Sequence, residues 1–182
     1  KHIDDADFYW HGEDKSFAGE SVSNAGDLNQ DGIDDLIIGA GWAAPRGTAY
    51  VVWGSTSLQS FGLAAATFKI HGDRSANRQF GVMVDGIGDV NDDGIPDIAV
   101  GEGGYAPNDV YIYYGPFASG MSLVDKEDAD IDFVGDNEED TFYKFARRLG
   151  DVDGDEVSDY VVGSANNRDD AGSVYIIPGS GW

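Results

Sequence analysis

The stretch DLNQDGIDD (27–35) places four aspartates and one asparagine within nine residues. Two similar stretches follow, DVNDDGIPD (89–97) and DVDGDEVSD (151–159), and each begins 62 residues after the previous one. Carboxylates this close repel one another unless a positive charge lies among them. The repeated loop therefore predicts three cation sites and three copies of one structural unit.

Each acidic loop is followed by an apolar run that ends in glycine (LIIG, IAVG, YVVG) and then by a second run (TAYVVWG, DVYIYYG, SVYIIPG). An aromatic residue precedes each loop (Phe17, Phe80, Phe142), and the segments DFYWHG, TFKIHG and DIDFVG lie further upstream. Short runs rich in Val, Ile, Tyr and Phe between Gly, Asp, Asn and Pro are typical of strands. We therefore expect strands around 67–71, 80–86, 97–101 and 110–114.

Four antiparallel strands in a unit of about 60 residues indicate an all-β fold built of β-propeller blades. The expected units are an outer strand (1–12) and three blades (13–72, 73–135 and 136–182). The last blade lacks its outer strand, and the N-terminal strand is the natural candidate to complete it. Two chains that exchange this strand would close a six-bladed homodimeric ring. An open arc, or a piece cut from a longer propeller, would explain the same pattern.

Alternating positions of each loop carry oxygen-bearing side chains. The predicted ligands are Asp27, Asn29, Asp31, Ile33 and Asp35; Asp89, Asn91, Asp93, Ile95 and Asp97; and Asp151, Asp153, Asp155, Val157 and Asp159. The apolar seventh residue would contribute its backbone carbonyl. A cage of six or seven oxygens suits Ca²⁺, whereas Mg²⁺ prefers fewer protein ligands.

The sixth position needs a sharp turn, which Gly32 and Gly94 permit. The third loop has Glu156 there, so we expect its calcium site to be weaker. The competing interpretation is that Asp-Gly and Asn-Asp pairs are ordinary hairpin turns. Three loops with Asp or Asn at the same four positions favour calcium binding over this interpretation, because a turn alone does not require those side chains at each position.

The loop differs from an EF-hand at one position. An EF-hand closes its cage with a bidentate Glu at position 12. Here position 12 is Ile38, Val100 or Val162, inside an apolar run. The ninth residue must close the cage instead.

Over nearly its whole length the chain resembles the FG-GAP repeat of the integrin α-subunit β-propeller. The motifs that carry the resemblance are the nine-residue loop, FGVMV from Phe80 and, more loosely, GAGWAAPRG from Gly39. Phe17 is followed by Ala18 and Phe142 by Tyr143, so only the middle repeat keeps FG, and GAP is nowhere intact. The resemblance implies an extracellular, calcium-stabilised adhesion or ligand-binding module in a propeller of seven blades, with ligands usually on the rim opposite the calcium.

The composition of the chain excludes several classes of partner and of metal site. The net charge of −23 argues against nucleic acid and anionic membranes as partners. The chain has no cysteine, which excludes disulfides and thiolate metal sites. No apolar run approaches the roughly 20 residues of a membrane span. No enzyme motif is recognisable, so we expect a non-enzymatic binding module for a protein or glycan.

Two alternatives remain open. The chain could be a non-catalytic accessory propeller of a larger secreted enzyme, or a lectin-like carbohydrate binder. Aromatic residues of the third strands fit core packing better than sugar stacking; these are Tyr50, Trp53, Tyr111, Tyr113, Tyr114 and Tyr175. Trp42 and Tyr105 lie in turns instead and are the candidate ligand-binding residues. Asp85 and Arg147 share a repeat position and are candidates for an ion pair near the propeller axis, with solvated charges as the alternative.

Overall fold

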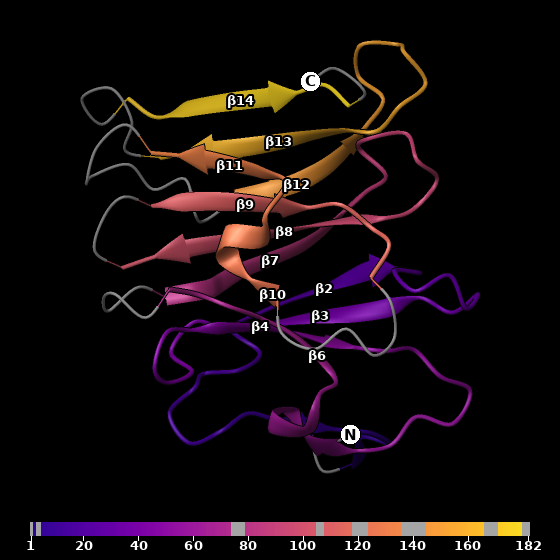
Figure 1. Ribbon diagram of the computed structural model, residues 1–182, viewed down its shortest axis with the longest axis vertical. Helices are drawn as coiled ribbons and strands as arrows, with labels where there is room; N and C mark the ends of the chain where they lie inside the picture. Colours follow the sequence, from indigo (N-terminus) through magenta and orange to yellow (C-terminus); the bar gives the residue numbers. More distant parts are fainter. Residues whose placement is uncertain are drawn as a thin grey trace.

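The computed structural model describes residues 2, 5–73, 79–104, 108–117, 124–135, 145–165 and 171–179. Within these ranges the regular structure is almost entirely β (Figure 1). The strands are β1 (Trp10–His11), β2 (Ser21–Gly26), β3 (Asp35–Ala40), β4 (Thr48–Val52), β5 (Phe61–Gly62), β6 (Phe68–His71), β7 (Gln79–Gly88), β8 (Asp97–Gly103), β9 (Asp109–Tyr113), β10 (Val124–Asp125), β11 (Ile131–Val134), β12 (Phe145–Gly150), β13 (Asp159–Ser164) and β14 (Ser173–Ile177). Two 3-10 turns, η2 (Leu63–Ala65) and η3 (Lys126–Asp128), lie in the connections.

The strands form three antiparallel blades, as the repeat predicts. Blade 1 is ordered β6-β4-β3-β2, blade 2 is β11-β9-β8-β7, and the third sheet is β12-β13-β14. The blades are stacked along the long axis of the molecule, with the two chain ends at opposite extremes (Figure 1). The four strands expected from the sequence are all present as β6, β7, β8 and β9, with β7 extended to Gly88 and β8 to Gly103.

Two short strands were not expected. β5 and β10 lie in the connections between the third and outer strands of blades 1 and 2. β10 pairs in parallel with β6, the outer strand of the preceding blade, and β5 pairs in parallel with β1. β1 is therefore held against blade 1. Within this chain it does not complete the third blade, because β14 lies at the other end of the molecule (Figure 1).

The core lies between the blades. One cluster joins blades 1 and 2 and includes Ile37, Val51, Phe68, Val84 and Tyr113. A second cluster joins blades 2 and 3 and includes Ile87, Ile112, Tyr160 and Val162, with Phe133 of β11 packed against Tyr160. Each strand turns alternate side chains to opposite faces, so both faces of blade 2 are buried.

The Phe-Gly pair of the middle repeat lies at the junction of blades 1 and 2. Phe80 is fully buried, and its ring lies 5.7 Å from that of Tyr111. Gly81 has a φ of +84°, and a Cβ built on it would lie 2.6 Å from the carbonyl oxygen of Thr48. Glycine is needed here because no side chain fits between the two backbones.

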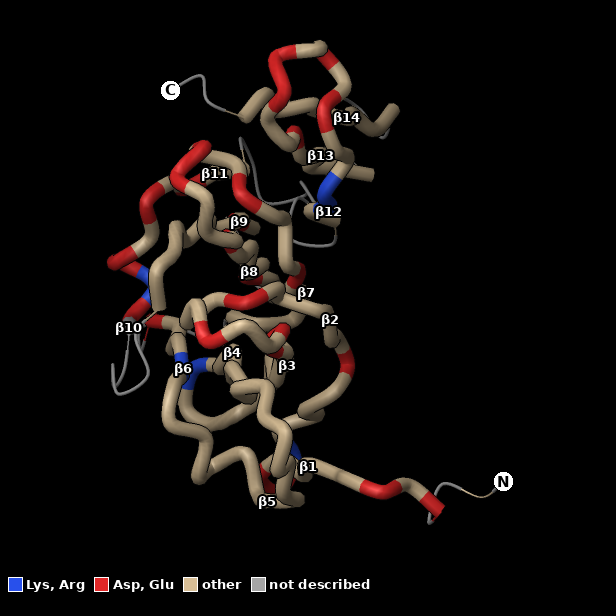
Figure 2. The backbone as a smooth tube through the Cα atoms, turned by 90° about the vertical axis from the view of Figure 1, so that its right-hand side faces the viewer, with Lys and Arg blue, Asp and Glu red and all other residues tan. Residues whose placement is uncertain are grey.

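Polar contacts join the first strands of the three blades. Ser23 Oγ donates a hydrogen bond to Asp85 Oδ1, and Arg147 lies 3.1 Å from Asp85 Oδ2. The predicted ion pair between Asp85 and Arg147 is thus confirmed. Figure 2 shows the basic residues of β12 as a blue segment, and acidic residues in red on several of the loops.

Candidate metal centres

The three acidic loops each join the first and second strands of a blade. They connect β2 to β3, β7 to β8, and β12 to β13, and they lie along one edge of the stacked blades (Figure 1). This placement follows from the antiparallel order, because equivalent turns of stacked blades end on the same side.

The ninth residue of each loop is buried and binds two backbone N–H groups. Asp35, Asp97 and Asp159 are 2%, 0% and 0% exposed. One oxygen accepts from the second loop residue (Leu28, Val90 or Val152) and the other from the glycine that follows the third strand (Gly54, Gly115 or Gly179), at distances of 2.6–3.0 Å. These bonds fix the loop to its own blade.

The first, third and fifth residues accept hydrogen bonds from backbone N–H groups of their own loop. In the first loop, Asp27 accepts hydrogen bonds from the N–H groups of Asp31 and Gly32, and Asn29 accepts a second bond from Asp31. The second loop repeats these bonds with Asp89 and Asn91. These bonds hold the side-chain oxygens against the backbone of their own loop.

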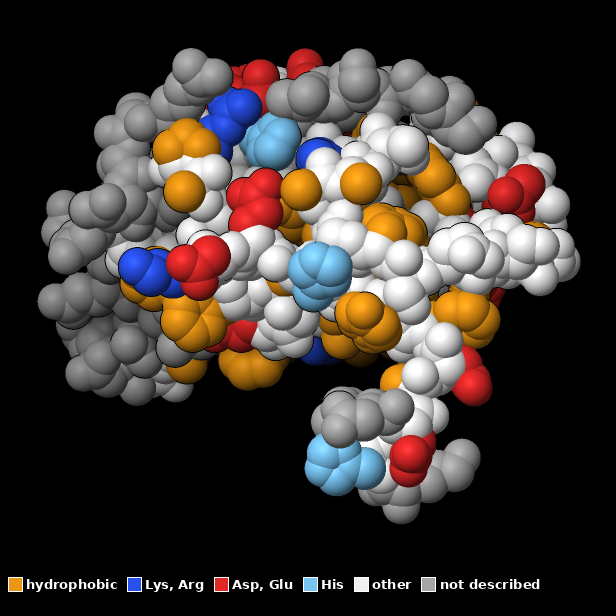
Figure 3. All heavy atoms as spheres, turned by 90° about the horizontal axis from the view of Figure 1, so that it is seen from below, with side chains coloured by type: hydrophobic (Ala, Val, Ile, Leu, Met, Phe, Trp, Pro, Cys, Tyr) orange, Lys and Arg blue, Asp and Glu red, His pale blue; other side chains and the backbone are white. Residues whose placement is uncertain are grey.

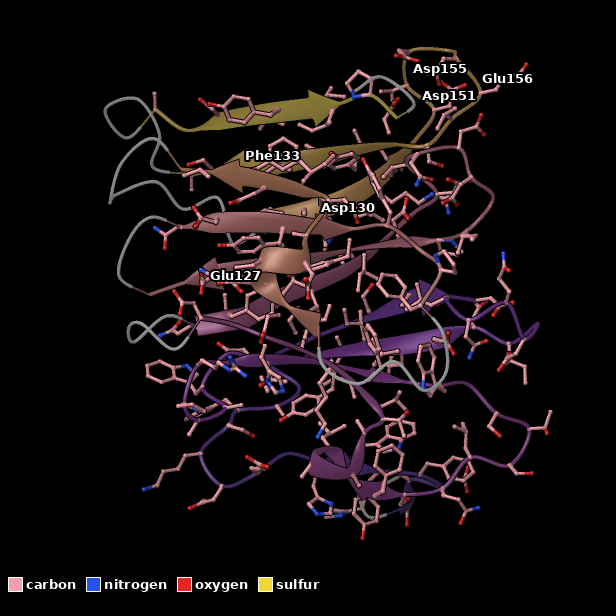
Figure 4. All side chains as sticks on the ribbon, viewed as in Figure 1. Glu127, Asp130, Phe133, Asp151, Asp155 and Glu156 are labelled. Carbon is pink, nitrogen blue, oxygen red and sulfur yellow. The ribbon has the colours of Figure 1, made fainter. Side chains whose placement is uncertain are left out.

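Among the described residues, the third loop is the one whose carboxylates converge closely. One carboxylate oxygen each from Asp151, Asp153 and Asp159 lie within 4.8 Å of one another. Figure 4 shows Asp151 and Asp155 on this loop beside Glu156. Two oxygens that share a Ca²⁺ at 2.3–2.6 Å are separated by no more than about 5 Å. The spacing therefore fits a single ion of this size.

The seventh residue anchors the loop through its side chain. Ile95 and Val157 are buried, and a Cβ built on Gly115 would lie 2.4 Å from Ile95 Cγ2. Ile33 has the same relation to Gly54, at 2.6 Å. With its side chain packed into the blade, the residue has only its backbone carbonyl to offer a cation.

Two residues in each loop have left-handed backbone conformations. At position 6 these are Gly32, Gly94 and Glu156, and at position 4 they are Gln30, Asp92 and Gly154. The glycine is at position 6 in the first two loops and at position 4 in the third. Each loop holds one non-glycine residue at positive φ. Backbone strain at Glu156 is therefore no reason to expect weaker calcium binding at the third loop than at the other two.

Burial and like charge act on the ninth residue. Burial raises the pKa of Asp97 to about 7, and the neighbouring carboxylates Asp93 and Asp89 add to the effect. Burial raises the pKa of Asp35 in the same way. In the third loop the N–H groups of Val152 and Gly179 hold the pKa of Asp159 below its usual value. In the first two loops, burial and neighbouring charge therefore disfavour the ionised form of the ninth aspartate, which a bound cation would favour.

Of the two candidate ligand-binding residues, Trp42 lies at the opposite edge. Trp42 follows β3, is 55% exposed, and its ring lies 6.1 Å from that of Phe17. Tyr105 lies outside the described residues. By contrast Tyr50, Tyr111 and Tyr113 are buried, as core packing predicts, and Trp53, Tyr114 and Tyr175 pack against the core clusters.

Comparison with known proteins gives the family. A model of the FG-GAP repeat matches residues 18–52, which span β2, the first acidic loop, β3 and β4. The chain belongs to the FG-GAP repeat family. Integrin alpha-6 of Gallus gallus is 32% identical over 155 residues (78% of this chain), integrin alpha-7 of Homo sapiens is 33% identical over 143 residues (76%), and integrin alpha-3 of Cricetulus griseus is 33% identical over 159 residues (84%).

The match covers only a small part of each integrin. The aligned region is 13% of integrin alpha-6, 11% of integrin alpha-7 and 14% of integrin alpha-3. Similarity therefore concerns the FG-GAP repeats and not the whole receptor. Within the described residues of this chain, no helix is long and apolar enough to cross a membrane.

The glycines whose N–H groups donate to the ninth aspartate (Gly54, Gly115 and Gly179) were not predicted as part of the site. Their signal was present in the sequence, because a glycine closes each third-strand run (VVWG, YIYYG and YIIPG). What the sequence did not reveal is that this glycine meets the acidic loop of the same blade.

Proposed function

We propose that this chain is a calcium-stabilised propeller segment of an extracellular, non-enzymatic adhesion or ligand-binding protein. The observation that carries the proposal is the agreement of the three acidic loops. Each has a buried ninth aspartate that accepts the same hydrogen bond from the second loop residue, and in the third loop three carboxylate oxygens converge. The integrin relatives support the adhesion role and the location outside the cell.

Calcium is the ion that the donors favour. Every side-chain donor is a carboxylate or amide oxygen, and neither His nor Cys occurs in the loops. Oxygen ligands in a curled backbone loop suit Ca²⁺ better than Mg²⁺, which keeps several waters and demands octahedral geometry. Three ions would reduce the net charge from −23 to −17. The ions would stabilise the loops, and metal binding and folding would be coupled.

The second loop offers a matched pair of variants. Asp93→Asn alters a proposed ligand, whereas Asp92→Asn makes the same charge change at the exposed neighbouring position. Titration calorimetry of the wild-type chain should give three calcium ions per chain, and Ca²⁺ should raise the melting temperature. Asp93→Asn should weaken one site by at least tenfold, and Asp92→Asn should leave all three intact. Wild-type melting that is the same in calcium and in chelator would refute the structural role of the ion.

The ligand-binding surface would be the edge opposite the calcium loops. Trp42 is exposed there, and so is its repeat equivalent Gly104, although blade 2 lies between two other blades. An exposed tryptophan at a rim suits stacking on a sugar or contact with a protein. Trp42→Ala should abolish retention on a panel of immobilised glycans and matrix glycoproteins while calcium binding is unchanged.

A further inference from the structure

One segment of the blade 2 connection is bound to both blade 1 and blade 2. This crossing segment (124–128) consists of β10 and η3. β10 pairs in parallel with β6 of blade 1, where Asp125 lies opposite His71. η3 is bound to blade 2, because the Tyr113 hydroxyl donates a hydrogen bond to the carbonyl oxygen of Lys126. The crossing segment therefore spans the junction of the two blades (Figure 1).

Two adjacent residues of the crossing segment carry opposite charges and pair with different blades. Asp125 Oδ1 lies 3.2 Å from Arg46 Nη1 of blade 1. Lys126 Nζ lies 2.9 Å from Glu102 Oε2 of blade 2. The N–H of Asp125 donates to the Asp128 carboxylate at 3.1 Å, which stabilises the bend between β10 and η3. Each ion pair therefore ties the same short segment to a different blade.

Basic residues are scarce in this chain, which has 11 Lys and Arg against 34 Asp and Glu. Figure 3, which views the molecule from below, shows them scattered over that face. Two of them, Arg46 and Lys126, meet at the crossing segment with side chains only 14% and 11% exposed. The Glu102 side chain is completely buried, whereas that of Asp125 is half-exposed. Buried pairs are screened less by salt than exposed ones, so the Lys126 pair is the stronger anchor.

Arg46 belongs to the same turn as the candidate ligand-binding residue Trp42. This turn (41–47) joins β3 to β4. The carbonyl oxygen of Ala43, the residue after Trp42, accepts hydrogen bonds from the N–H groups of Arg46 and Gly47, at 3.1 and 2.7 Å. The turn is therefore compact, and a displacement of Arg46 would displace Trp42 with it.

Glu102 belongs to a cluster at the base of the β8–β9 connection. Tyr111 Oη lies 3.0 Å from Glu102 Oε2, 3.1 Å from Asp109 Oδ2 and 3.3 Å from Lys126 Nζ. Glu102 is the last residue but one of β8, and Asp109 begins β9. The cluster therefore holds the end of β8 and the start of β9 together, and Lys126 takes part in it.

We propose that Asp125 and Lys126 are positioning residues that couple the turn 41–47 of blade 1 to the β8–β9 connection of blade 2. Both connections follow the second strand of a blade, so they lie at the same edge, opposite the acidic loops. The inference rests on the proposed function, because it takes this edge as the ligand-binding surface. Neither residue needs to touch the ligand. Together they would hold the two connections as one recognition unit, through contiguous contacts of a kind that can carry coupling.

The first experiment measures amide hydrogen exchange of the full chain without ligand, in millimolar Ca²⁺. Asp125→Asn should raise exchange in the turn 41–47 at least fivefold, although residue 125 is far from the turn in sequence. The charge reversal Arg46→Asp with Asp125→Arg should return exchange to within twofold of the wild type. The control Glu127→Gln changes an exposed charge of the same segment (Figure 4) and should have no effect. Unchanged exchange in Asp125→Asn, or failure of the reversed pair to restore it, would overturn the proposal.

A second pair of substitutions tests coupling from the blade 2 side. Lys126→Gln alone would leave the buried Glu102 carboxylate without this partner, which is strongly destabilising. Glu102→Gln combined with Lys126→Gln removes both charges of the pair together. Neither residue contacts Arg46 in a printed ion pair or hydrogen bond, yet the double variant should raise exchange in the turn 41–47 at least threefold. An increase confined to blade 2 would show two independent anchors and would contradict the coupling.

Binding to the panel of immobilised glycans and matrix glycoproteins separates this inference from the proposed function. For a panel member that retains the wild type, Asp125→Asn should weaken retention at least threefold, and the reversed pair should restore it. If Trp42→Ala abolishes retention but Asp125→Asn does not weaken it, the proposed positioning role is wrong and the ligand-binding edge stands. If Trp42→Ala leaves retention intact, the ligand-binding edge is wrong, while the exchange measurements still decide whether the two connections are coupled.

Discussion

The backbone N–H of Gly115 donates a hydrogen bond to Asp97 Oδ1 at 2.9 Å, although the two residues are 18 positions apart. Gly54 and Asp35 form the same bond in blade 1, and Gly179 and Asp159 form it in the third blade. Each bond ties the end of a third strand to the acidic loop of its own blade. This hydrogen bond therefore holds the ninth aspartate of the proposed calcium site in place without a metal ion. We call it the glycine–aspartate brace.

Gly115→Ala should weaken this brace. The new Cβ would lie 2.4 Å from Ile95 Cγ2 and 2.9 Å from the carbonyl oxygen of Pro96. Overpacking of this kind costs about 1–3 kcal/mol of unfolding free energy. Urea unfolding in chelator should show the loss, and calorimetry should show weaker binding at the second calcium site. Glu127→Ala, an exposed change on η3 (Figure 4), is the control and should have no effect. An unchanged free energy of unfolding for Gly115→Ala would show that the backbone at Gly115 can shift to accommodate the new Cβ, and would contradict the prediction.

Phe80→Ala and Phe17→Ala should differ strongly, although the two residues occupy matching places in the repeat. Phe80 is completely buried between blades 1 and 2, and removing such a ring costs about 3–5 kcal/mol. Phe17 is 64% exposed, and a surface truncation of this kind costs less than about 1 kcal/mol. Both variants should be compared by urea unfolding of the chain under identical conditions. Similar losses for the two would contradict the different burial of the two rings.

Sequence periodicity predicted the blades because their strands repeat locally every 62 residues. The ninth aspartate of each loop was correctly placed at the start of the second strand, because the apolar run that follows it marks that strand. The calcium ligands themselves stay a prediction. The pair of Asp85 and Arg147 was also found from the repeat, because equivalent positions of stacked blades lie near one another.

Contacts between blades could not be predicted in the same way. β5 and β10 are two residues long, and they meet the previous outer strand at separations of more than 50 residues, such as Ile70 with Val124. A strand of two residues is too short to show the alternation of apolar and polar residues by which strands are recognised in a sequence. The pairing of β1 with β5 was missed for this reason, and so was the fact that β1 stays with blade 1.

Glu156→Gly should stabilise the third loop. Glu156 has a φ of +73°, a conformation that costs a non-glycine residue about 1–2 kcal/mol. Glycine removes this strain but loses about 0.5–1 kcal/mol through the greater entropy of the unfolded chain. The net expectation is a gain of about 0.5–1 kcal/mol in chelator, measured by urea unfolding. Glu127→Gly, in the ordinary conformation of η3, is the control and should lose stability. A loss at both positions would show that Glu156 is not strained.

His71 should make folding sensitive to mild acid. Burial lowers the pKa of its imidazole below 6.5, and the nearby charges of Arg46 and Lys69 act in the same direction, while those of Asp125 and Glu13 oppose them. The unfolded chain takes up a proton near pH 6.5 that folded His71 does not accept, so the free energy of unfolding decreases as the pH falls through 6.5. The decrease ends once the pH is below the pKa of the folded state. Proton NMR should give this lower pKa directly. His71→Gln should remove the corresponding part of the pH dependence of stability between pH 7.5 and about 5, whereas His2→Gln should retain it. A folded-state pKa at or above 6.5 would contradict the burial of this side chain beside Thr48.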